Sequence, residues 1–451
     1  MSFIDETKIN QILQQTKTPS TEQVKEILNI AKQKKGLNLE QTAVLLNSDA
    51  DDEIKAIANQ IKQEIYGDRI VLFAPLYLSS FCVNNCKYCG FHSDNKTPRQ
   101  KLSLKQVTEQ TQEIIKMGHK RILVEVGEDA INTPIDYVVD AIQEIYKAKL
   151  NNGEIRRVNV NIAATTVDNY KKLKAIGIGT YQLFQETYHK ETYKSLHQGP
   201  KADYERQLYA HDKAFQAGLD DLGIGVLFGL YHYKFEALCL LEHANYLNDK
   251  YGIGPHTISF PRLNSAPTVD FQSANLVTDQ EFLKLIAIMR LAVPYTGMIL
   301  STRETPEIRK QAFDLGISQA SAASRTAPGG YGKKEKVEQF SLSDHRPLHE
   351  VITSMIKDGY LPSFCTACYR IERTGEKFMS IAKRGEIHEF CFPNALLTFQ
   401  EYLEDYTSDQ LKKDGQTIID KNVLIINNPD IKEQTKHKLD QIKQGQRDLY
   451  F

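Results

Sequence analysis

The sequence lacks a surplus of either charge and lacks any long apolar segment. Its 451 residues include 56 Lys and Arg against 57 Asp and Glu, which leaves a net charge of -1. This balance gives no electrostatic footprint for nucleic acid or for an anionic membrane. No run of about 18 uncharged apolar residues is present, so no membrane-spanning helix is expected. The first residues, MSFIDETKINQ, contain neither the basic nor the apolar part of a secretory signal, and we therefore expect a cytoplasmic location.

Cysteine is also scarce, and its seven residues are unevenly distributed. One of them, Cys239 in the run ALCLLEHANYL, is interpreted as plain core, because a free cysteine behaves as a small hydrophobe. A disulfide framework would place an even number of cysteines along a short secreted chain. Grouped cysteines in a long chain more often bind metal. The other six form two groups, Cys82, Cys86 and Cys89 in the first and Cys365, Cys368 and Cys391 in the second.

The middle of the chain alternates short β-rich runs with amphipathic helical stretches. Eight strands, each followed by a helix, within roughly 250 residues are typical of a (β/α)8 TIM barrel. A doubly wound open sheet is the alternative, since periodicity alone cannot prove closure. The expected strands are 70–78, 121–126, 157–162, 180–185, 222–228, 256–260, 297–301 and 317–320.

Three regions follow from this α/β pattern. Residues 1–60 are predicted to form an N-terminal helical extension, with a capping box from Ser20 to Gln23 before a helix over 21–35. Residues 61–340 form the barrel, and the glycine-rich loop that begins at Ala327 marks a break after its last strand. Residues 341–451 form a third, mainly helical region that contains the second cysteine group.

The first cysteine group directly follows the first barrel strand and reads Cys-Val-Asn-Asn-Cys-Lys-Tyr-Cys-Gly-Phe from Cys82 to Phe91. Thiolates spaced in this way can hold three corners of an iron–sulfur cubane and leave one iron open. A structural zinc site would close at four ligands. The spacing, with Tyr88 before the third cysteine, resembles the radical SAM superfamily, whose 4Fe-4S cluster binds S-adenosylmethionine (SAM). A three-cysteine structural metal site is the alternative.

The resemblance extends to the SAM-binding motifs. It implies that Gly127 and Glu128 match the Gly-Glu motif that receives the methionine ammonium, with Tyr88 beside the cluster. Glu186 matches the carboxylate that binds the ribose hydroxyls, and Arg206 is positioned to pair with the methionine carboxylate. Each residue alone would also fit a solvated position on the barrel rim. Bound in this way, SAM is the source of a 5′-deoxyadenosyl radical, and the protein orients it.

The second cysteine group reads Cys-Thr-Ala-Cys-Tyr-Arg from Cys365, with Cys391 further along. Taken alone, it would fit a zinc site completed by His388. Its surroundings, with Arg373-Thr-Gly, Phe378-Met and Cys391-Phe-Pro-Asn, resemble the HydG family, the radical SAM tyrosine lyases that mature FeFe hydrogenase in H-cluster assembly. The resemblance covers almost the whole chain. The related thiamine-pathway tyrosine lyases share the barrel but lack this C-terminal iron–sulfur domain.

The resemblance implies a reaction and its partners. The family cleaves the Cα–Cβ bond of L-tyrosine to p-cresol and dehydroglycine, which yields carbon monoxide and cyanide. An auxiliary 4Fe-4S or 5Fe cluster, with an extra iron and a cysteine ligand, collects both as an Fe(CO)2(CN) synthon. The implied partners are L-tyrosine, a one-electron reductant of the ferredoxin or flavodoxin type, and other hydrogenase maturation proteins. The alternative is a 2-iminoacetate synthase that makes dehydroglycine for thiazole synthesis.

Substrate and iron contacts are expected at opposite ends of the barrel. Arg303 is predicted to bind the substrate carboxylate, with Ser321 and Arg325 as further contacts, although a rim ion pair between Arg303 and Glu304 would also explain this arginine. His256 would be structural on its own context, and the resemblance makes it the ligand of the extra iron. Because His256 opens its strand, the second cluster is expected at the mouth opposite the SAM cluster, with an internal channel between them. A non-catalytic electron-transfer protein and a zinc-stapled scaffold are the rival functions.

Overall fold

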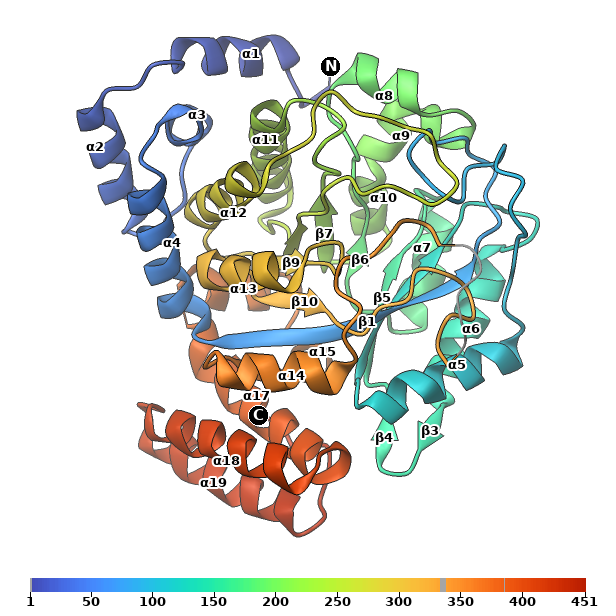
Figure 1. Cartoon of the computed structure of the whole chain (residues 1–451), viewed down its shortest axis with the longest axis vertical. Helices are drawn as coiled ribbons and strands as arrows, with labels where there is room; N and C mark the ends of the chain where they lie inside the picture. Colours follow the sequence, from blue (N-terminus) through green and yellow to red (C-terminus); the bar gives the residue numbers. More distant parts are fainter. Residues whose placement is uncertain (1, 333–337, 385) are drawn as a thin grey trace.

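A closed barrel of eight parallel strands forms the centre of the computed structural model, which describes residues 2–332, 338–384 and 386–451 (Figure 1). Neighbouring strands pair in parallel, and the last one closes the barrel through the register Val71↔Gln319. Closure confirms the predicted barrel and excludes the open sheet. The strands are β1 (Arg69–Ser79), β2 (Arg121–Val126), β5 (Arg157–Asn161), β6 (Tyr181–Gln182), β7 (Leu222–Gly225), β8 (Thr257–Ser259), β9 (Gly297–Leu300) and β10 (Gln319–Ser321).

Several strands are shorter than the apolar runs that predicted them. β6, for example, contains only Tyr181 and Gln182. The ladder nevertheless continues past it, because the backbone N–H groups of Leu183 and Gln185 donate to the carbonyls of Gly223 and Gly225. We call the carboxyl ends of the barrel strands the upper mouth and their amino ends the lower mouth.

Helices cover the outside of the barrel because each buries one apolar face. On α6 (Ile135–Lys147), the buried residues Val138, Ala141, Ile142 and Ile145 share the inner face. Capping boxes start α5 (Leu104–Met117) and α12 (Asp279–Ala292). The other helices are α7 (Val167–Ala175), α8 (Lys190–Leu196), α9 (Tyr204–Leu208), α10 (Ala210–Gln216), α11 (Tyr233–Tyr251) and α13 (Pro306–Leu315), with a short 3-10 turn η1 (Pro200–Ala202) and a hairpin of β3 (Lys149–Leu150) and β4 (Gly153–Glu154).

Four N-terminal helices pack on the side of the barrel that carries α11, α12 and α13. The predicted capping box from Ser20 to Gln23 is present, but the helix that it starts ends at Ala31, before the predicted end. The chain then turns at Lys34, whose φ of 59° is left-handed. The predicted boundary at residue 60 falls inside the fourth of these helices. They are α1 (Glu6–Gln15), α2 (Thr21–Ala31), α3 (Leu39–Asn47) and α4 (Asp51–Tyr66).

The C-terminal region is largely helical, and its last two helices lie at the bottom of the molecule in Figure 1. Its strand β11 (Leu361–Ser363) pairs in parallel with the start of β1, in addition to the eight strands that close the barrel. Glu401 fastens the region to the barrel, because its carboxylate lies 2.9 Å from both Lys120 Nζ and Arg156 Nη1 and all three side chains are buried. The helices are α14 (Leu348–Lys357), α15 (Ala367–Arg370), α16 (Gly375–Lys383), α17 (Ile387–Tyr406), α18 (Asp409–Leu424) and α19 (Pro429–Lys443).

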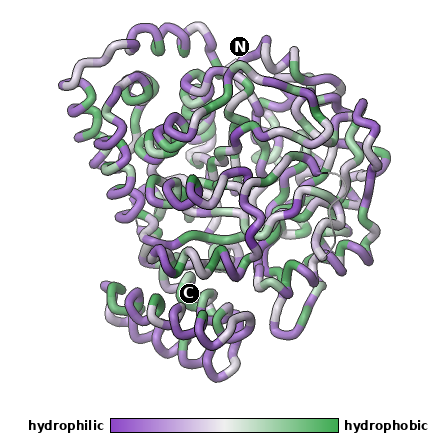
Figure 2. Tube along the Cα trace, viewed as in Figure 1, coloured by the Kyte–Doolittle hydropathy of each residue, from purple (hydrophilic) through white to green (hydrophobic). Residues whose placement is uncertain are grey.

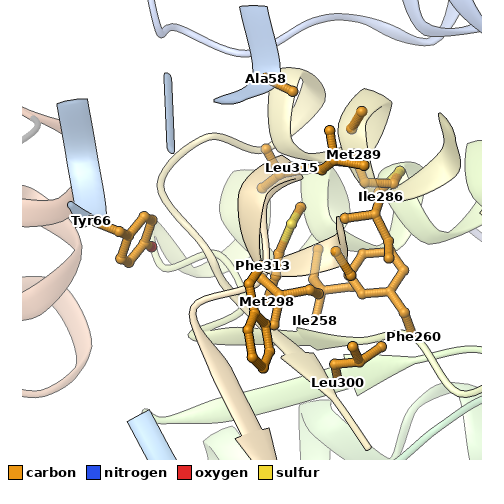
Figure 3. Packing of buried hydrophobic residues seen from close by; sticks show 14 of the residues in the cluster. Ala58, Tyr66, Ile258, Phe260, Ile286, Met289, Met298, Leu300, Phe313 and Leu315 are labelled. Carbon is orange, nitrogen blue, oxygen red and sulfur yellow. The ribbon is translucent and has the colours of Figure 1, made fainter. Parts of the chain in front are cut away.

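The main core lies between the barrel and its helices. Ile258, Met298 and Leu300 point outward from β8 and β9 and pack against α12 and α13, as Figure 3 shows. Hydrophilic residues follow the outer faces of the helices, most clearly on α18 and α19 in Figure 2. Among the residues that the structure describes, no helix is long and apolar enough to cross a membrane.

Three apolar side chains form a separate small cluster inside the barrel. Phe73, Leu123 and Ile299 are almost completely buried there, on β1, β2 and β9. They lie at the floor of a cavity that opens toward the upper mouth. The inward residues two positions earlier, Val71, Arg121 and Gly297, line a second cavity at the lower mouth. We call Phe73, Leu123 and Ile299 the apolar layer, because it lies between the two cavities.

Candidate active site

The loop that leaves β1 at the upper mouth carries Cys82, Cys86 and Cys89. Amide groups surround the sulfur atoms: the Asn84 side chain donates to Cys82 Sγ at 3.8 Å, and the Phe91 backbone N–H donates to Cys89 Sγ at 3.4 Å. The side chain of Gln339 also donates to Cys89 Sγ, at 3.8 Å. Such donors stabilise negative charge on sulfur and tune iron–sulfur clusters. The loop therefore provides three sulfur atoms, and those of Cys82 and Cys89 accept hydrogen bonds that suit a cluster.

Burial opposes the ionisation of two of these cysteines in the absence of a metal centre. It raises the pKa of Cys86 well above its ordinary value and raises the pKa of Cys89 to about 11. A metal centre would remove these protons, because coordinated thiols are deprotonated. In residues 2–332, 338–384 and 386–451, no three His, Cys, Asp or Glu side chains surround a single-ion site. A cubane contains several irons, so its ligands lie farther apart than those of one ion, and the amide donors to Cys82 and Cys89 suit such a cluster.

The Gly-Glu segment at the end of β2 packs directly against the cysteine loop. A Cβ at Gly127 would lie 2.3 Å from the carbonyl oxygen of Phe81, so only glycine allows this approach. The backbone of Glu128 accepts a hydrogen bond from the N–H of Val83 at 2.7 Å. Its carboxylate accepts from Asn84 at 2.6 Å and from Arg206 Nη2 at 2.5 Å. The predicted SAM residues Glu128 and Arg206 therefore lie together beside the cysteine loop.

One guanidinium nitrogen of Arg206 is available to a further partner. Its Nη2 also donates to the carbonyl of Ala164, whereas its buried Nη1 has no hydrogen-bond partner within the described part of the chain. Buried polar groups are normally hydrogen-bonded, and an orphaned one calls for an explanation. A carboxylate such as that of the SAM methionine would satisfy this nitrogen.

Glu186 lies across the mouth from Glu128, in a left-handed backbone conformation with a φ of 69°. Its carboxylate pairs with Lys201 Nζ at 2.6 Å. Burial alone would lower the pKa of Lys201, but the charges of Glu186 and Cys86 raise it above its ordinary value. Sequence reasoning missed Lys201, because a lysine in a Gly-Pro-Lys turn belongs to no motif. Tyr88, the remaining SAM residue, bonds His197 through its hydroxyl group at 2.7 Å and lines the cavity next to Cys89.

The upper cavity has a volume of about 150 Å³ and contains most of the predicted substrate contacts. Arg303 lines it, with its guanidinium 3.3 Å from the centre of the Phe340 ring. The alternative ion pair with Glu304 is not observed, because the Glu304 carboxylate is bound by Arg262. Ser321 lines the same cavity, and its Oγ accepts from the backbone of Thr302 at 3.2 Å. Arg303 is thus left facing the cavity.

The third predicted substrate contact lies elsewhere. Arg325 lines a different cavity of about 380 Å³, with Tyr331, Tyr402 and residues of α5 and α14. Its neighbours Ser324 and Thr326 line the upper cavity, so the side chain of Arg325 points the opposite way, and the sequence offers no way to predict the direction of a side chain in such a loop.

The upper cavity also holds polar residues that sequence reasoning did not single out. Glu125 and Asn161 project from β2 and β5, and Asn161 Nδ2 donates to Glu125 Oε1 at 3.3 Å. Burial raises the pKa of Glu125 to about 8. A signal was available, because the alternation in Arg-Ile-Leu-Val-Glu-Val turns Arg121, Leu123 and Glu125 to the inside of the barrel.

The second cysteine group lies at the lower mouth. Cys365, Cys368 and Cys391 line a cavity of about 50 Å³ together with His256. The hydrogen bond from Cys368, followed by the charges of Arg69, Arg373 and Arg121, lowers the pKa of Cys391 despite its burial. β1 has 11 residues, and a strand of that length extends about 35 Å. The two cysteine groups lie at opposite ends of it.

His256 faces the second cysteine group across this cavity. Its Nε2 lies 3.3 Å from the Tyr369 hydroxyl, and its Nδ1 lies 3.7 Å from the carboxylate of Asp221. Burial lowers the pKa of His256, so it presents a neutral ring, which is the form that binds metal. The side chain of His388, the alternative zinc ligand, lies outside the part that the structure describes.

Comparison with known proteins agrees with this geometry. Residues 76–247 match the family described as the Radical SAM superfamily, and residues 259–361 match the Biotin and Thiamin Synthesis associated domain. A crystal structure described as HydG, a maturase of the [FeFe]-hydrogenase, has 52% identity and a TM-score of 0.97, and the match covers 100% of both chains. This chain belongs to the HydG family of radical SAM enzymes.

Two further similar proteins support the assignment of this chain to the HydG family. The FeFe-hydrogenase maturase HydG from Carboxydothermus hydrogenoformans is 40% identical with a TM-score of 0.85, over 96% of this chain and 97% of that one. The 2-iminoacetate synthase of Salmonella typhimurium is 30% identical over 332 residues, which are 72% of this chain and 86% of that protein. As a HydG family member, the chain is a radical SAM lyase, and its family implies a 4Fe-4S cluster, SAM and a reductant.

Proposed function

We propose that the chain cleaves L-tyrosine to p-cresol and dehydroglycine and that the products are assembled at its lower mouth for FeFe-hydrogenase maturation. The observation that carries this proposal is the position of two cysteine groups at opposite mouths of one barrel, with the cavity of Arg303 next to the first. The printed names of the relatives, HydG maturase and 2-iminoacetate synthase, support the two halves of the proposal.

At the upper mouth, Cys82, Cys86 and Cys89 would hold the 4Fe-4S cluster. Arg206, with its unpartnered Nη1, would pair with the carboxylate of SAM, and Glu128 would accept its ammonium. Glu186 would bind the ribose and Tyr88 would border the cluster. When bound, the cluster and SAM supply the radical that removes a hydrogen atom from the substrate.

Within the upper cavity, the chain's own residues orient the substrate. Arg303 would bind the tyrosine carboxylate, and Ser321 would contribute a hydroxyl group nearby. The aromatic ring would lie against the apolar layer of Phe73, Leu123 and Ile299. Arg325 is not retained as a substrate contact, because it lines a different cavity.

At the lower mouth, Cys365, Cys368 and Cys391 would hold an auxiliary iron–sulfur cluster, and His256 would bind an extra iron with a cysteine ligand. Buried sulfur atoms beside three arginines and a neutral histidine fit such a centre. Carbon monoxide and cyanide, derived from dehydroglycine, would be collected there as an Fe(CO)2(CN) synthon. The proposed recipients are other hydrogenase maturation proteins, and the proposed electron donor is of the ferredoxin or flavodoxin type.

Thiamine-pathway dehydroglycine synthesis is the second candidate, and the 30% identity to a 2-iminoacetate synthase favours it. That match leaves more than a quarter of this chain uncovered, whereas the HydG match covers all of it. The extra sulfur site therefore favours hydrogenase maturation.

One experiment separates the candidates. The protein would be reconstituted anaerobically with iron and sulfide and incubated with SAM, dithionite and tyrosine. We expect deoxyadenosine, p-cresol, carbon monoxide and cyanide. Release of p-cresol without carbon monoxide or cyanide would favour the thiamine pathway. Absence of deoxyadenosine would indicate an electron-transfer protein, and zinc without acid-labile sulfide would indicate a scaffold.

A further inference from the structure

A half-buried carboxylate, that of Glu125, faces the upper cavity and has no role in the reaction proposed above. Glu125 lies on β2, in register with Tyr77 of β1 and Asn161 of β5, so the three side chains share one level of the barrel. Building on the proposed tyrosine lyase function, we propose that Glu125 binds the α-amino group of the substrate and takes its ammonium proton. Glu125 is then a second substrate-binding residue in the cavity, opposite in charge to Arg303.

The position of Glu125 suits an amino group that must lie next to SAM. Glu125 precedes Gly127 by two residues of the same strand, or about 7 Å. The Gly-Glu segment in turn packs against the cysteine loop, and Tyr88 and Cys89 line the same cavity as Glu125. A substrate nitrogen held at Glu125 would therefore lie at the cluster end of the cavity, where the hydrogen is removed.

The charges in the cavity match a zwitterion. Glu186 is already paired with Lys201, whereas Glu125 makes no salt bridge with any described residue, and its protein contact is the amide of Asn161. Arg303 is likewise not paired with Glu304, its alternative partner, because Glu304 binds Arg262. The cavity thus presents one cation and one carboxylate without ionic partners, as the adjacent carboxylate and ammonium of an α-amino acid require.

The proton affinity of Glu125 suits the transfer. Burial raises the pKa of Glu125 to about 8, well above that of an ordinary carboxyl group, so this side chain holds a proton more tightly than an exposed glutamate. The groups that face it are Tyr77, Asn161, Arg303, Glu186 and Lys201. The transfer is R–NH3+ plus Glu125–COO− to R–NH2 plus Glu125–COOH, which conserves the proton and leaves a neutral amine as the hydrogen donor. A general base is most effective when its pKa lies near the operating pH, and burial moves the pKa of Glu125 toward that range.

Proton release on binding is the direct consequence. Below a pH of about 8, Glu125 of the free enzyme is protonated, and tyrosine binds as its ammonium form. The pair formed by Glu125 and the amino group shares only one of these two protons, so the other is released to solvent. Binding near pH 7 should then release close to one proton, and binding above about pH 9 should release none, because Glu125 is already ionised.

The test uses reconstituted enzyme with SAM but no reductant, so that tyrosine binds without turnover. Calorimetry in two buffers with different ionisation enthalpies measures the proton count and the Kd. For Glu125→Gln, which preserves the acceptor for Asn161, we expect loss of the proton release and a Kd for tyrosine that rises about 10- to 100-fold. Glu125→Asp, which keeps a carboxylate, should retain proton release.

An analogue without the amino group isolates the contact. 3-(4-Hydroxyphenyl)propanoate should bind wild type and Glu125→Gln with the same Kd, within about threefold, because it offers Glu125 nothing to bind. The matched control is Glu236→Gln on α11. Glu236 is a buried glutamate outside the cavity, and burial raises its pKa to about 8 as well. Its carboxylate accepts hydrogen bonds from the Thr187 hydroxyl group and the Tyr188 backbone N–H. This variant should leave tyrosine affinity and proton release unchanged.

Three outcomes would overturn the inference. They are wild-type binding near pH 7 without proton release, unaltered tyrosine affinity in Glu125→Gln, and equal weakening of tyrosine and the analogue. Failure of the wild-type enzyme to bind tyrosine or to form p-cresol would instead overturn the proposed function itself.

Discussion

The two cysteine groups lie at opposite ends of β1 and are built in different ways. At the upper mouth, one short loop supplies all three sulfur atoms, and neighbouring amides donate to them. At the lower mouth, Cys365 and Cys368 follow β11 whereas Cys391 comes from α17, and arginines surround them. The upper site is therefore encoded by local spacing, and the lower one depends on how the C-terminal region packs against the barrel.

The largest effect is expected from breaking the upper site. Cys86→Ala should abolish both SAM cleavage and p-cresol formation, because the cluster would lose one of three ligands. Deoxyadenosine and p-cresol would be measured by chromatography after anaerobic reconstitution. Cys239→Ala, at a buried cysteine of α11 that lies in neither group, serves as the control and should keep both products. Near-normal p-cresol from Cys86→Ala would contradict the assignment of the cluster.

Breaking the lower site should have a narrower effect. The double variant Cys365→Ala, Cys368→Ala should keep p-cresol formation and lose the iron carbonyl–cyanide product, which infrared spectroscopy would detect. The reason is that the tyrosine cavity lies at the other mouth. If this variant lost p-cresol while its SAM cluster remained intact, the two sites would not be independent.

The anchor of the C-terminal region provides an intermediate test. Glu401→Gln removes the charge that neutralises Lys120 and Arg156 in a buried site, and this should cost about 3–5 kcal/mol of unfolding free energy. Urea unfolding of the reconstituted protein would measure the loss. Glu109→Gln, at an exposed ion pair with Lys105, is the matched control and should change stability by less than about 1 kcal/mol. A normal unfolding midpoint for Glu401→Gln would mean that other contacts hold the region.

The smallest effect is expected at the substrate carboxylate. Arg303→Lys keeps the charge but loses the paired donors of the guanidinium, so the KM for tyrosine should rise roughly 10-fold while SAM affinity stays the same. Steady-state kinetics and equilibrium SAM binding would check this. Arg325→Lys, in the other cavity, should leave the KM unchanged. An unaltered KM in Arg303→Ala would remove this residue from the substrate site.

Periodicity predicted the barrel well, because each of the eight strands is marked by an apolar run. Glu128, Glu186 and Arg206 were instead implied by the resemblance to the radical SAM superfamily, and Arg206 lies on α9 and not at a strand end. Closure through β10 and β1 could not be predicted, because it joins residues about 250 positions apart and depends on twist accumulated over the whole sheet.

Contacts made by loops could not be predicted, because the path of a loop leaves no periodic pattern in the sequence. Lys201 reaches Glu186 only because the turn after α8 folds back over the mouth, and no periodic pattern records that path. β11 has three residues including Pro362, which is too short a run to signal a strand. Arg262, which binds Glu304 and so frees Arg303, depends on tertiary packing alone.

The apolar layer inside the barrel sets a rule for passage between the mouths. Phe73, Leu123 and Ile299 separate two cavities that each contain charged side chains, and a charged molecule that crossed the layer would shed its hydration without gaining a partner, at a cost of several kcal/mol. A small uncharged molecule would meet no such penalty. Any passage through this layer would therefore favour small uncharged molecules over ions.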